Sequence, residues 1–146
     1  MSSLVGKKLT AGYGGVDIIK DINLEVNQGE IVVIVGPNGA GKSTAMKALL
    51  GMLNLTSGSV EYSEKEITKM LPQNRINLGL AFVPQTQNVF TGMTVQENLE
   101  MGGFLREDEI THTINDVYNL FPILKEKRSQ NAGELSGGQR QQVAFG

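Results

Sequence analysis

The residues with the clearest capacity for chemistry form one short segment, residues 36–43, with the sequence GPNGAGKS. It matches the pattern G-x-x-x-x-G-K-[ST], in which successive backbone N–H groups wrap a polyphosphate. Gly36, Gly39 and Gly41 keep side chains away from the phosphates and allow a positive φ angle. An ordinary glycine-rich turn is the alternative. The segment follows an apolar run and precedes helix-forming residues, which favours a phosphate-binding loop.

Two side chains at the end of this segment would complete the site. Lys42 can supply a mobile positive charge to the β- and γ-phosphates, and the Ser43 hydroxyl is placed to ligate Mg²⁺. A helix beginning near Lys42 would direct the positive end of its dipole at the phosphates. Asn38 and Thr44, within and directly after the segment, are further candidate nucleotide-binding residues.

A second segment with similar properties is residues 134–146, ELSGGQRQQVAFG. Ser136 can cap the helix that follows, while Gly137 and Gly138 leave backbone N–H groups open to an anion. A plain capped helix with flexible glycines is the alternative interpretation. The two segments together predict two anion-binding helix N-termini in one chain.

Hydrophobic patterning predicts the elements that position these segments. Residues 22–26 alternate apolar and polar side chains, as a half-buried strand does, and residues 27–29 form a turn signal. Residues 30–35, EIVVIV, are a run rich in β-branched side chains, which predicts a strand covered on both faces in a parallel sheet. Further expected elements are strands at residues 59–62 and 78–83 and a helix at residues 42–52.

The second half of the chain has a helical pattern from about Thr94. An apolar stripe recurs at steps of three and four residues. Its members are Ile110, Ile114, Val117, Leu120, Phe121 and Leu124. Pro122 is expected to end or kink the helix that it interrupts. The order of elements predicts an α/β core that carries a helical subdomain.

Composition limits the kind of protein and partner. The chain has 146 residues, enough for one domain, and a formal net charge of −2, so general attraction to nucleic acid is not expected. It has no cysteine, which excludes a disulfide framework. No apolar run reaches the length of a membrane span. Phosphate binding must therefore be local, and membrane association is expected only through a partner.

With these motifs in order, the chain resembles the ATP-binding cassette (ABC) family, the ATPase subunits of membrane transporters. Residues 36–44, GPNGAGKST, correspond to its Walker A loop and residues 135–139, LSGGQ, to its signature. The resemblance implies a partial P-loop NTPase core of α/β class with an antiparallel β subdomain, over about residues 1–89. It also implies a helical signature subdomain over about residues 90–146.

The resemblance also implies roles for single residues toward ATP and Mg²⁺. Tyr13 lies where the family stacks an aromatic ring on adenine, and Gln85 lies where the family positions the Mg²⁺ and the attacking water. Ser136, Gly137, Gly138 and Gln139 would contact the ATP of a partner subunit. The implied partners are a second cassette subunit, identical or different, and membrane permease subunits, which would hold the protein at the cytoplasmic face of the inner membrane.

Within the family, residues 93–104 and 117–138 look most like the importers of branched-chain amino acids. The family's Walker B aspartate, catalytic glutamate and switch histidine lie beyond the signature helix, and only seven residues (146 − 139) follow Gln139. We therefore expect the chain to be the N-terminal part of a longer ATPase, and to fold poorly and lack activity alone. The alternatives are a repair or ribosome-associated cassette ATPase, or a non-catalytic nucleotide-binding module.

Overall fold

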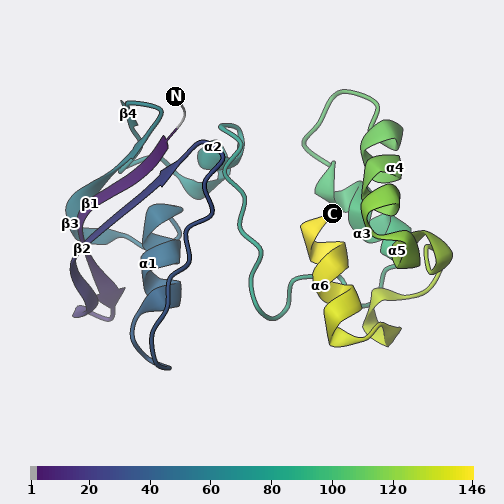
Figure 1. The fold of residues 1–146 in the computed structure, drawn as a ribbon, viewed down its shortest axis with the longest axis horizontal. Coiled ribbons are helices and arrows are strands. Elements are labelled where there is room, and N and C mark those ends of the chain that lie inside the picture. Colours follow the sequence, from purple (N-terminus) through teal and green to yellow (C-terminus); the bar gives the residue numbers. More distant parts are fainter. Residues whose placement is uncertain (1–2) are drawn as a thin grey trace. The chain divides into compact units, whose positions relative to one another are not determined.

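The computed structural model describes residues 3–146, and the chain divides into two compact units. The first unit ends at Phe82 and the second spans Val83–Gly146. Figure 1 shows a sheet and helices in the first unit and helices alone in the second. Gln85 therefore belongs to the helical unit, whereas the sequence analysis expected the first part of the chain to extend to about residue 89.

The first unit is built on a four-stranded antiparallel sheet with strand order β2-β1-β3-β4. The strands are β1 (Ser3–Tyr13), β2 (Val16–Asn27), β3 (Leu55–Tyr62) and β4 (Lys65–Glu66). The predicted strands at residues 22–26 and 59–62 are confirmed within β2 and β3. The predicted turn is confirmed as well, since the Glu30 N–H donates to the Asn27 carbonyl at 3.1 Å.

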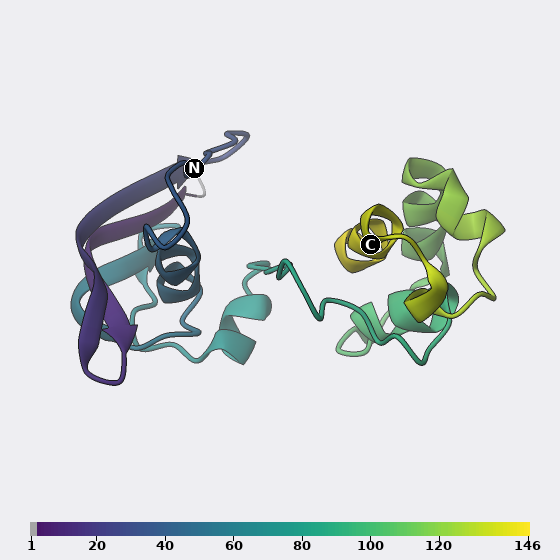
Figure 2. The same ribbon diagram turned by 90° about the horizontal axis from the view of Figure 1, so that it is seen from below.

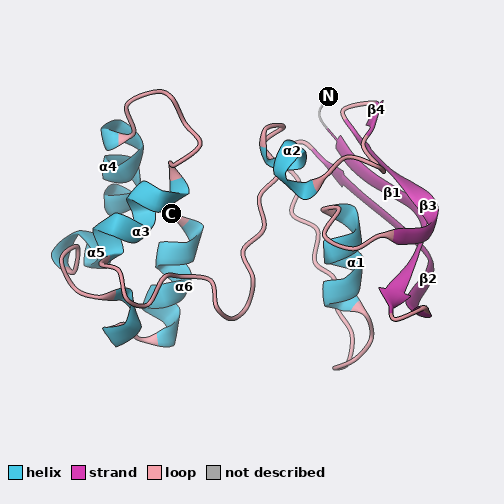
Figure 3. Cartoon of the chain, turned by 180° about the vertical axis from the view of Figure 1, so that it is seen from behind, coloured by secondary structure: helices cyan, strands magenta, loops and turns pink. Residues whose placement is uncertain are grey.

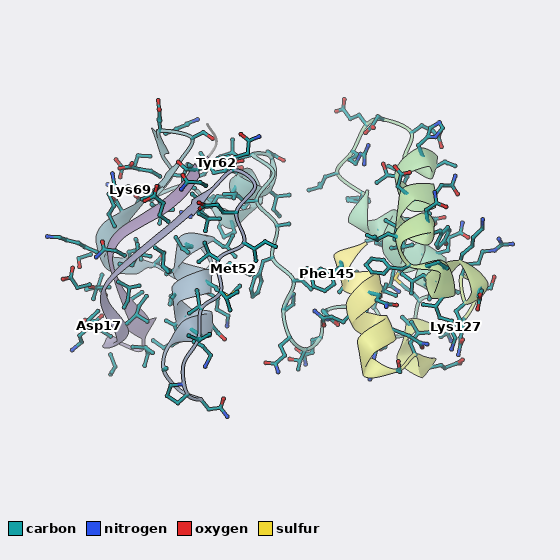
Figure 4. The ribbon with its side chains drawn as sticks, in the orientation of Figure 1. Asp17, Met52, Tyr62, Lys69, Lys127 and Phe145 are labelled. Atoms are coloured by element: carbon teal, nitrogen blue, oxygen red, sulfur yellow. The ribbon has the colours of Figure 1, made fainter. Side chains whose placement is uncertain are left out.

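The hairpin between β1 and β2 places Tyr13 at its tip. Tyr13 pairs with Val16, and Gly12 with Asp17. A Cβ at Gly12 would lie 1.7 Å from the Val16 carbonyl oxygen, so only glycine fits there. Asp17, labelled in Figure 4, accepts a hydrogen bond of 2.8 Å from Thr56 Oγ1 of β3. The end of the sheet that carries Tyr13 is thus fixed by close backbone packing and a polar contact.

Helix α1 (Lys42–Leu49) lies along one face of this sheet (Figure 1). The core between them is apolar. Its buried residues are Leu9, Ala11, Ile19, Ala45, Ala48, Leu49, Val60 and Ile67. The helix predicted over residues 42–52 begins at the expected residue and ends at Leu49, with Gly51 following at a φ of +72°.

A buried arginine fixes the C-terminal end of α1. Arg75, on α2 (Pro72–Ile76), is 1% exposed, and its guanidinium donates to the Leu49 carbonyl at 2.5 Å. It also donates to the carbonyls of Met70, Ile67 and Thr68 at 2.6–3.0 Å. Burial lowers the pKa of Arg75, yet a guanidinium keeps its proton near neutrality. A cation at a helix C-terminus complements the helix dipole.

Two predicted strands are wrong for this structure. Residues 30–35 form no strand, and Ile31, Val33 and Val35 are 92%, 72% and 83% exposed. Residues 78–83 are likewise turn and irregular backbone. A strand needs a neighbour for its backbone hydrogen bonds, and among residues 3–146 neither segment pairs with another. Their apolar composition alone could not supply that neighbour.

The second unit consists of helices around a separate apolar core. The helices are α3 (Val95–Gly102), α4 (Thr111–Leu120), α5 (Pro122–Glu126), the 3₁₀ helix η1 (Ala132–Glu134) and α6 (Gly137–Phe145). The core contains Val95, Leu99, Tyr118, Leu124, Ala132, Leu135 and Val143. Figure 2 shows this unit turned by 90°, and Figure 3 shows it as helices joined by loops. The helical pattern predicted from Thr94 is confirmed.

The apolar stripe of the second unit is confirmed in part. As predicted, Pro122 separates two helices: α4 ends at Leu120, Phe121 leaves the helical conformation, and Pro122 begins α5. Leu124 is fully buried, but Leu120, the last residue of α4, is 71% exposed because its position in the helical turn lies to the side of the stripe. Within residues 3–146, no helix has the length and apolarity needed to span a membrane.

Candidate functional site

The N-terminus of α1 is open, and this is its most informative feature. Its N-cap residue, Gly41, has φ 86° and ψ 8°, and no side chain of the described residues caps the helix. The first N–H groups of a helix have no partner within the helix. Such groups at a helix N-terminus form a site for an anion, because the helix dipole adds to their partial positive charge.

Close packing holds the loop before α1 against the sheet. A Cβ at Gly41 would lie 2.7 Å from Ile19 Cγ2 of β2, so the backbone approaches the sheet more closely than any other residue allows. Ile19 pairs with Ala11 of β1, two residues before Tyr13. The loop therefore packs on the same pair of strands that ends in the Tyr13 hairpin.

Lys42 points back into the loop that precedes it. Its Nζ donates to the Gly36 carbonyl at 2.8 Å and to the Pro37 carbonyl at 2.7 Å. An ammonium group has three N–H donors, so one remains for a ligand. The two carbonyls hold a positive charge at the loop, as the predicted phosphate-binding role requires.

The other predicted residues of this loop differ in accessibility. Ser43 lies in the first turn of α1 and is exposed, so its hydroxyl is available to a metal or an anion. Asn38 is exposed at the tip of the loop. Thr44 is buried at 7% exposure, which places its side chain in the packed face of α1. Of these three side chains, Ser43 has the best position for a metal ligand.

Tyr13 is half-exposed at the hairpin tip, with 50% of its surface accessible. Lys47 Nζ, one turn after Ser43 on α1, lies 6.0 Å from the centre of the Tyr13 ring. The tyrosine predicted to stack on a base is therefore next to the helix whose N-terminus is open. Lys47 was not predicted as a site residue, because no sequence motif marks it. Only the packing of α1 brings it to the Tyr13 ring.

The second candidate site begins α6, and unlike α1 this helix is capped. The Gln139 N–H donates to Ser136 Oγ at 3.3 Å, and the Ser136 N–H donates to Gln139 Oε1 at 3.2 Å. This reciprocal pair is a capping box. The predicted cap is confirmed. A Cβ at Gly137 or Gly138 would meet no atom within 4 Å, so both glycines leave the surface of the first turn open.

A second capping box in the same unit gives a reference for the first. The Thr94 N–H donates to Glu97 Oε2 at 2.7 Å, and the Glu97 N–H donates to Thr94 Oγ1 at 3.2 Å. Hydrogen bonds from the Thr94 backbone and then from its hydroxyl lower the pKa of Glu97. The box at α3 is therefore charged, whereas the box at α6 is neutral.

Gln85 and the start of α6 line one hollow of the second unit. The hollow has a volume of about 220 Å³, and its lining includes Gln85, Gly137 and Arg140. The structure thus brings together two residues that lie 52 positions apart (137 − 85) and that the sequence analysis named separately. Two further residues of its wall, Asn88 and Gln141, carry no sequence signal.

These observations fit ATP and Mg²⁺ as the groups bound. The uncapped N-terminus of α1 can accept an anion, the ammonium of Lys42 lies at the loop, and the Ser43 hydroxyl is accessible. A hydroxyl next to a polyphosphate is a hard oxygen ligand of the kind that Mg²⁺ prefers.

Comparison with known proteins identifies the family. The family described as ABC transporter matches residues 19–146. The chain is 40% identical over 139 residues to "Probable branched-chain amino acid transport ATP-binding protein LivF" of Archaeoglobus fulgidus, covering 94% of this chain and 59% of that protein. It is 40% identical over 140 residues to the high-affinity branched-chain amino acid transport ATP-binding protein BraG of Pseudomonas aeruginosa, covering 95% and 60%.

Relatives with other printed substrates match as well. The sn-glycerol-3-phosphate import ATP-binding protein UgpC of Brucella abortus is 36% identical over 150 residues, covering 100% of this chain and 42% of that protein. Among solved structures, a nucleotide-free ATP-binding cassette from an ABC transporter superposes with a TM-score of 0.80 at 28% identity, over 99% of this chain and 63% of that one.

The chain spans about 60% of the length of the branched-chain amino acid relatives that it matches. The match to this solved cassette confirms the predicted α/β P-loop fold, and the region matched by the family includes the phosphate loop, Gln85 and the signature. By sequence and by fold, the chain belongs to the ABC transporter family.

Proposed function

We propose that the chain is the nucleotide-binding part of an ATPase subunit that drives an importer, with branched-chain amino acids as the transported substrates. The open N-terminus of α1 carries the nucleotide-binding part of this proposal: it is an uncapped helix end with a lysine ammonium held at the preceding loop. The two relatives at 40% identity support the substrate.

In this proposal each residue has a defined task. Backbone N–H groups of the loop and the first turn of α1 hold the phosphates, with Lys42 donating its third N–H. Ser43 and Gln85 hold Mg²⁺, which neutralises charge on the phosphates, and Gln85 also orients water. Tyr13 stacks on the adenine through its exposed ring. Ser136 to Gln139 present their open first turn to the nucleotide of a second subunit.

The same proposal assigns the partners. ATP held between the loop of one subunit and the signature of another makes pairing dependent on nucleotide, and hydrolysis separates the pair. Permease subunits would hold the pair at the cytoplasmic face of the inner membrane and use this cycle to move the substrate.

Nucleotide binding is tested with Lys42→Ala in the complete gene product. Loss of a charge-assisted donor to a phosphate costs about 1.5–3 kcal/mol, which is about 10- to 150-fold in affinity for a fluorescent ATP analogue. Lys20→Ala is the matched control, because it removes the same charge from an exposed position on β2. Equal affinities of the Lys42 and Lys20 variants would contradict the role of the loop.

The substrate is tested by uptake in cells that lack the gene. Uptake of labelled leucine, isoleucine and valine is expected to fall and to return with the wild-type gene but not with Lys42→Ala. Labelled sn-glycerol 3-phosphate is the control substrate, since a relative at 36% identity is named for it. A deletion that lowers only glycerol 3-phosphate uptake would reassign the substrate while leaving nucleotide binding intact.

A further inference from the structure

The loop that carries Gln85 is closed on itself by one side chain. Asn88 Nδ2 donates to the Pro84 carbonyl at 3.3 Å, which joins the two ends of residues 84–88. Within this loop Gln87 has a φ of +54°, a left-handed conformation that costs a non-glycine residue about 1 kcal/mol. Such a conformation persists only where surrounding contacts impose it. The Asn88 side chain is a contact of that kind.

The same amide group ties the loop to the signature helix. Asn88 Nδ2 donates to Gln141 Oε1 at 2.7 Å in a partly buried position. An asparagine amide has two N–H donors, and the carbonyl of Pro84 and the side chain of Gln141 use both. Asn88 and Gln141 also form part of the wall of the hollow that contains Gln85 and Gly137.

Gln141 lies on the same face of α6 as a residue of the first turn. It lies four residues after Gly137, and residues four apart share one face of a helix. The Asn88–Gln141 hydrogen bond therefore joins the Gln85 loop to the helix face that begins at the signature glycine. Any displacement of the loop along this bond acts on the end of α6 that carries Ser136.

A backbone hydrogen bond also joins the segment after Gln85 to the segment before the signature. The Gly133 N–H, three residues before Ser136, donates to the Thr91 carbonyl at 3.0 Å. A Cβ at Gly133 would lie 2.9 Å from that oxygen, so the two backbones are in close contact. The segment after Gln85 is thus attached to the chain just before the signature, at Gly133, and just after it, at Gln141. Asn88 supplies the second of these attachments.

From this geometry we infer that Asn88 is a positioning residue that makes the Gln85 loop and the signature helix move as one body through Gln141. The inference rests on the proposed function, because it concerns how the two nucleotide-contacting segments are coordinated. Asn88 does not touch nucleotide in this role. It sets the position of Ser136 to Gly138 when Gln85 responds to the nucleotide of its own subunit.

The test is a double-mutant cycle in the complete gene product, with Asn88→Ala, Gln141→Ala and both together. Each single change is expected to lower kcat for ATP hydrolysis about 5- to 10-fold, the effect of one lost hydrogen bond, with KM for ATP unchanged. The double variant should be no slower than the slower single variant, because both remove one interaction. Gln130→Ala is the matched control, since it removes an amide hydrogen bond to Glu134 away from the hollow.

A second measurement does not depend on hydrolysis. Hydrogen exchange of the amides at residues 137–139 should become about 5- to 10-fold faster in Asn88→Ala and stay unchanged in Gln130→Ala. Multiplicative effects in the cycle, or unchanged exchange at residues 137–139, would overturn the role of Asn88. If wild-type protein hydrolyses ATP normally in that case, only the positioning role fails. A wild-type protein that neither binds nor hydrolyses ATP overturns the proposed function as well.

Discussion

The two helices that begin at candidate nucleotide sites are stabilised at opposite ends. Helix α1 is held at its C-terminus by the buried Arg75, and its N-terminus has no side-chain cap among the described residues. Helix α6 is capped at its N-terminus by Ser136 and Gln139. The two helices therefore offer two kinds of candidate anion site. At α1 the first N–H groups have no side-chain partner among the described residues, so a ligand can bind them. At α6 the capping box is already formed, and the helix presents the open surface of its two glycines.

The largest effect should come from removing the anchor of α1. Arg75→Met deletes the donor to four carbonyls, two of them in buried and two in partly buried hydrogen bonds, and we expect the free energy of unfolding to fall by about 3–5 kcal/mol. Arg75→Lys is the control that keeps the charge, and it should recover only part of the loss because an ammonium has three donors. Chemical denaturation measures both. A loss below about 1 kcal/mol for Met would mean that α1 is not anchored through Arg75.

Gly41→Ala tests the open end of α1. The left-handed backbone costs an alanine about 1–2 kcal/mol, and contact of the new Cβ with Ile19 adds about 1 kcal/mol. The control is Gly14→Ala, which has a φ of +59° but free space around its Cβ. Stability should fall in both variants, more in Gly41→Ala, and nucleotide affinity should fall more in Gly41→Ala, since Gly14 adjoins only Tyr13 while Gly41 belongs to the phosphate loop itself. Equal affinity in the two variants would separate the loop geometry from binding.

The cap of α6 is compared with that of α3 through Ser136→Ala and Thr94→Ala. Each removes the hydroxyl of a capping box, and each should cost about 1 kcal/mol in thermal denaturation. Nucleotide-dependent pairing of the complete gene product should weaken only for Ser136→Ala, measured by sedimentation with Mg²⁺ and ATP. Equal pairing of both variants would reduce the signature serine to an ordinary cap.

The smallest effect is a difference in pH dependence between the two boxes. Hydrogen bonds from Thr94 lower the pKa of Glu97 in the folded chain. Its contribution is therefore complete above the ordinary glutamate pKa of about 4.3 and is lost as the pH falls through the lower folded value. Glu97→Gln should remove this acid-dependent part of α3 stability, measured by hydrogen exchange between pH 3 and 6. Exchange at α6, where Gln139 does not titrate, should not show it.

Sequence patterns determined the local features of this protein. The loop at residues 36–43, the helix starting at Lys42, the cap at Ser136 and the break at Pro122 were all predicted. These features depend on residue type over a few positions, through backbone conformation, capping and the geometry of proline. The family could be predicted from the sequence for the same reason. Its two motifs are short and contiguous, and they lie far apart along the chain.

Contacts between residues far apart in the sequence could be seen only in the tertiary structure. The apolar run at residues 31–35 looked like a buried strand, yet it lies exposed because strand formation requires a partner that no local pattern specifies. No local pattern marks Arg75 for burial, which depends on carbonyls brought together from α1 and the segment before α2. The bond between Asn88 and Gln141 joins residues 53 positions apart. Tertiary packing brings such pairs together, because hydrogen bonding acts over about 3 Å whatever the separation in sequence.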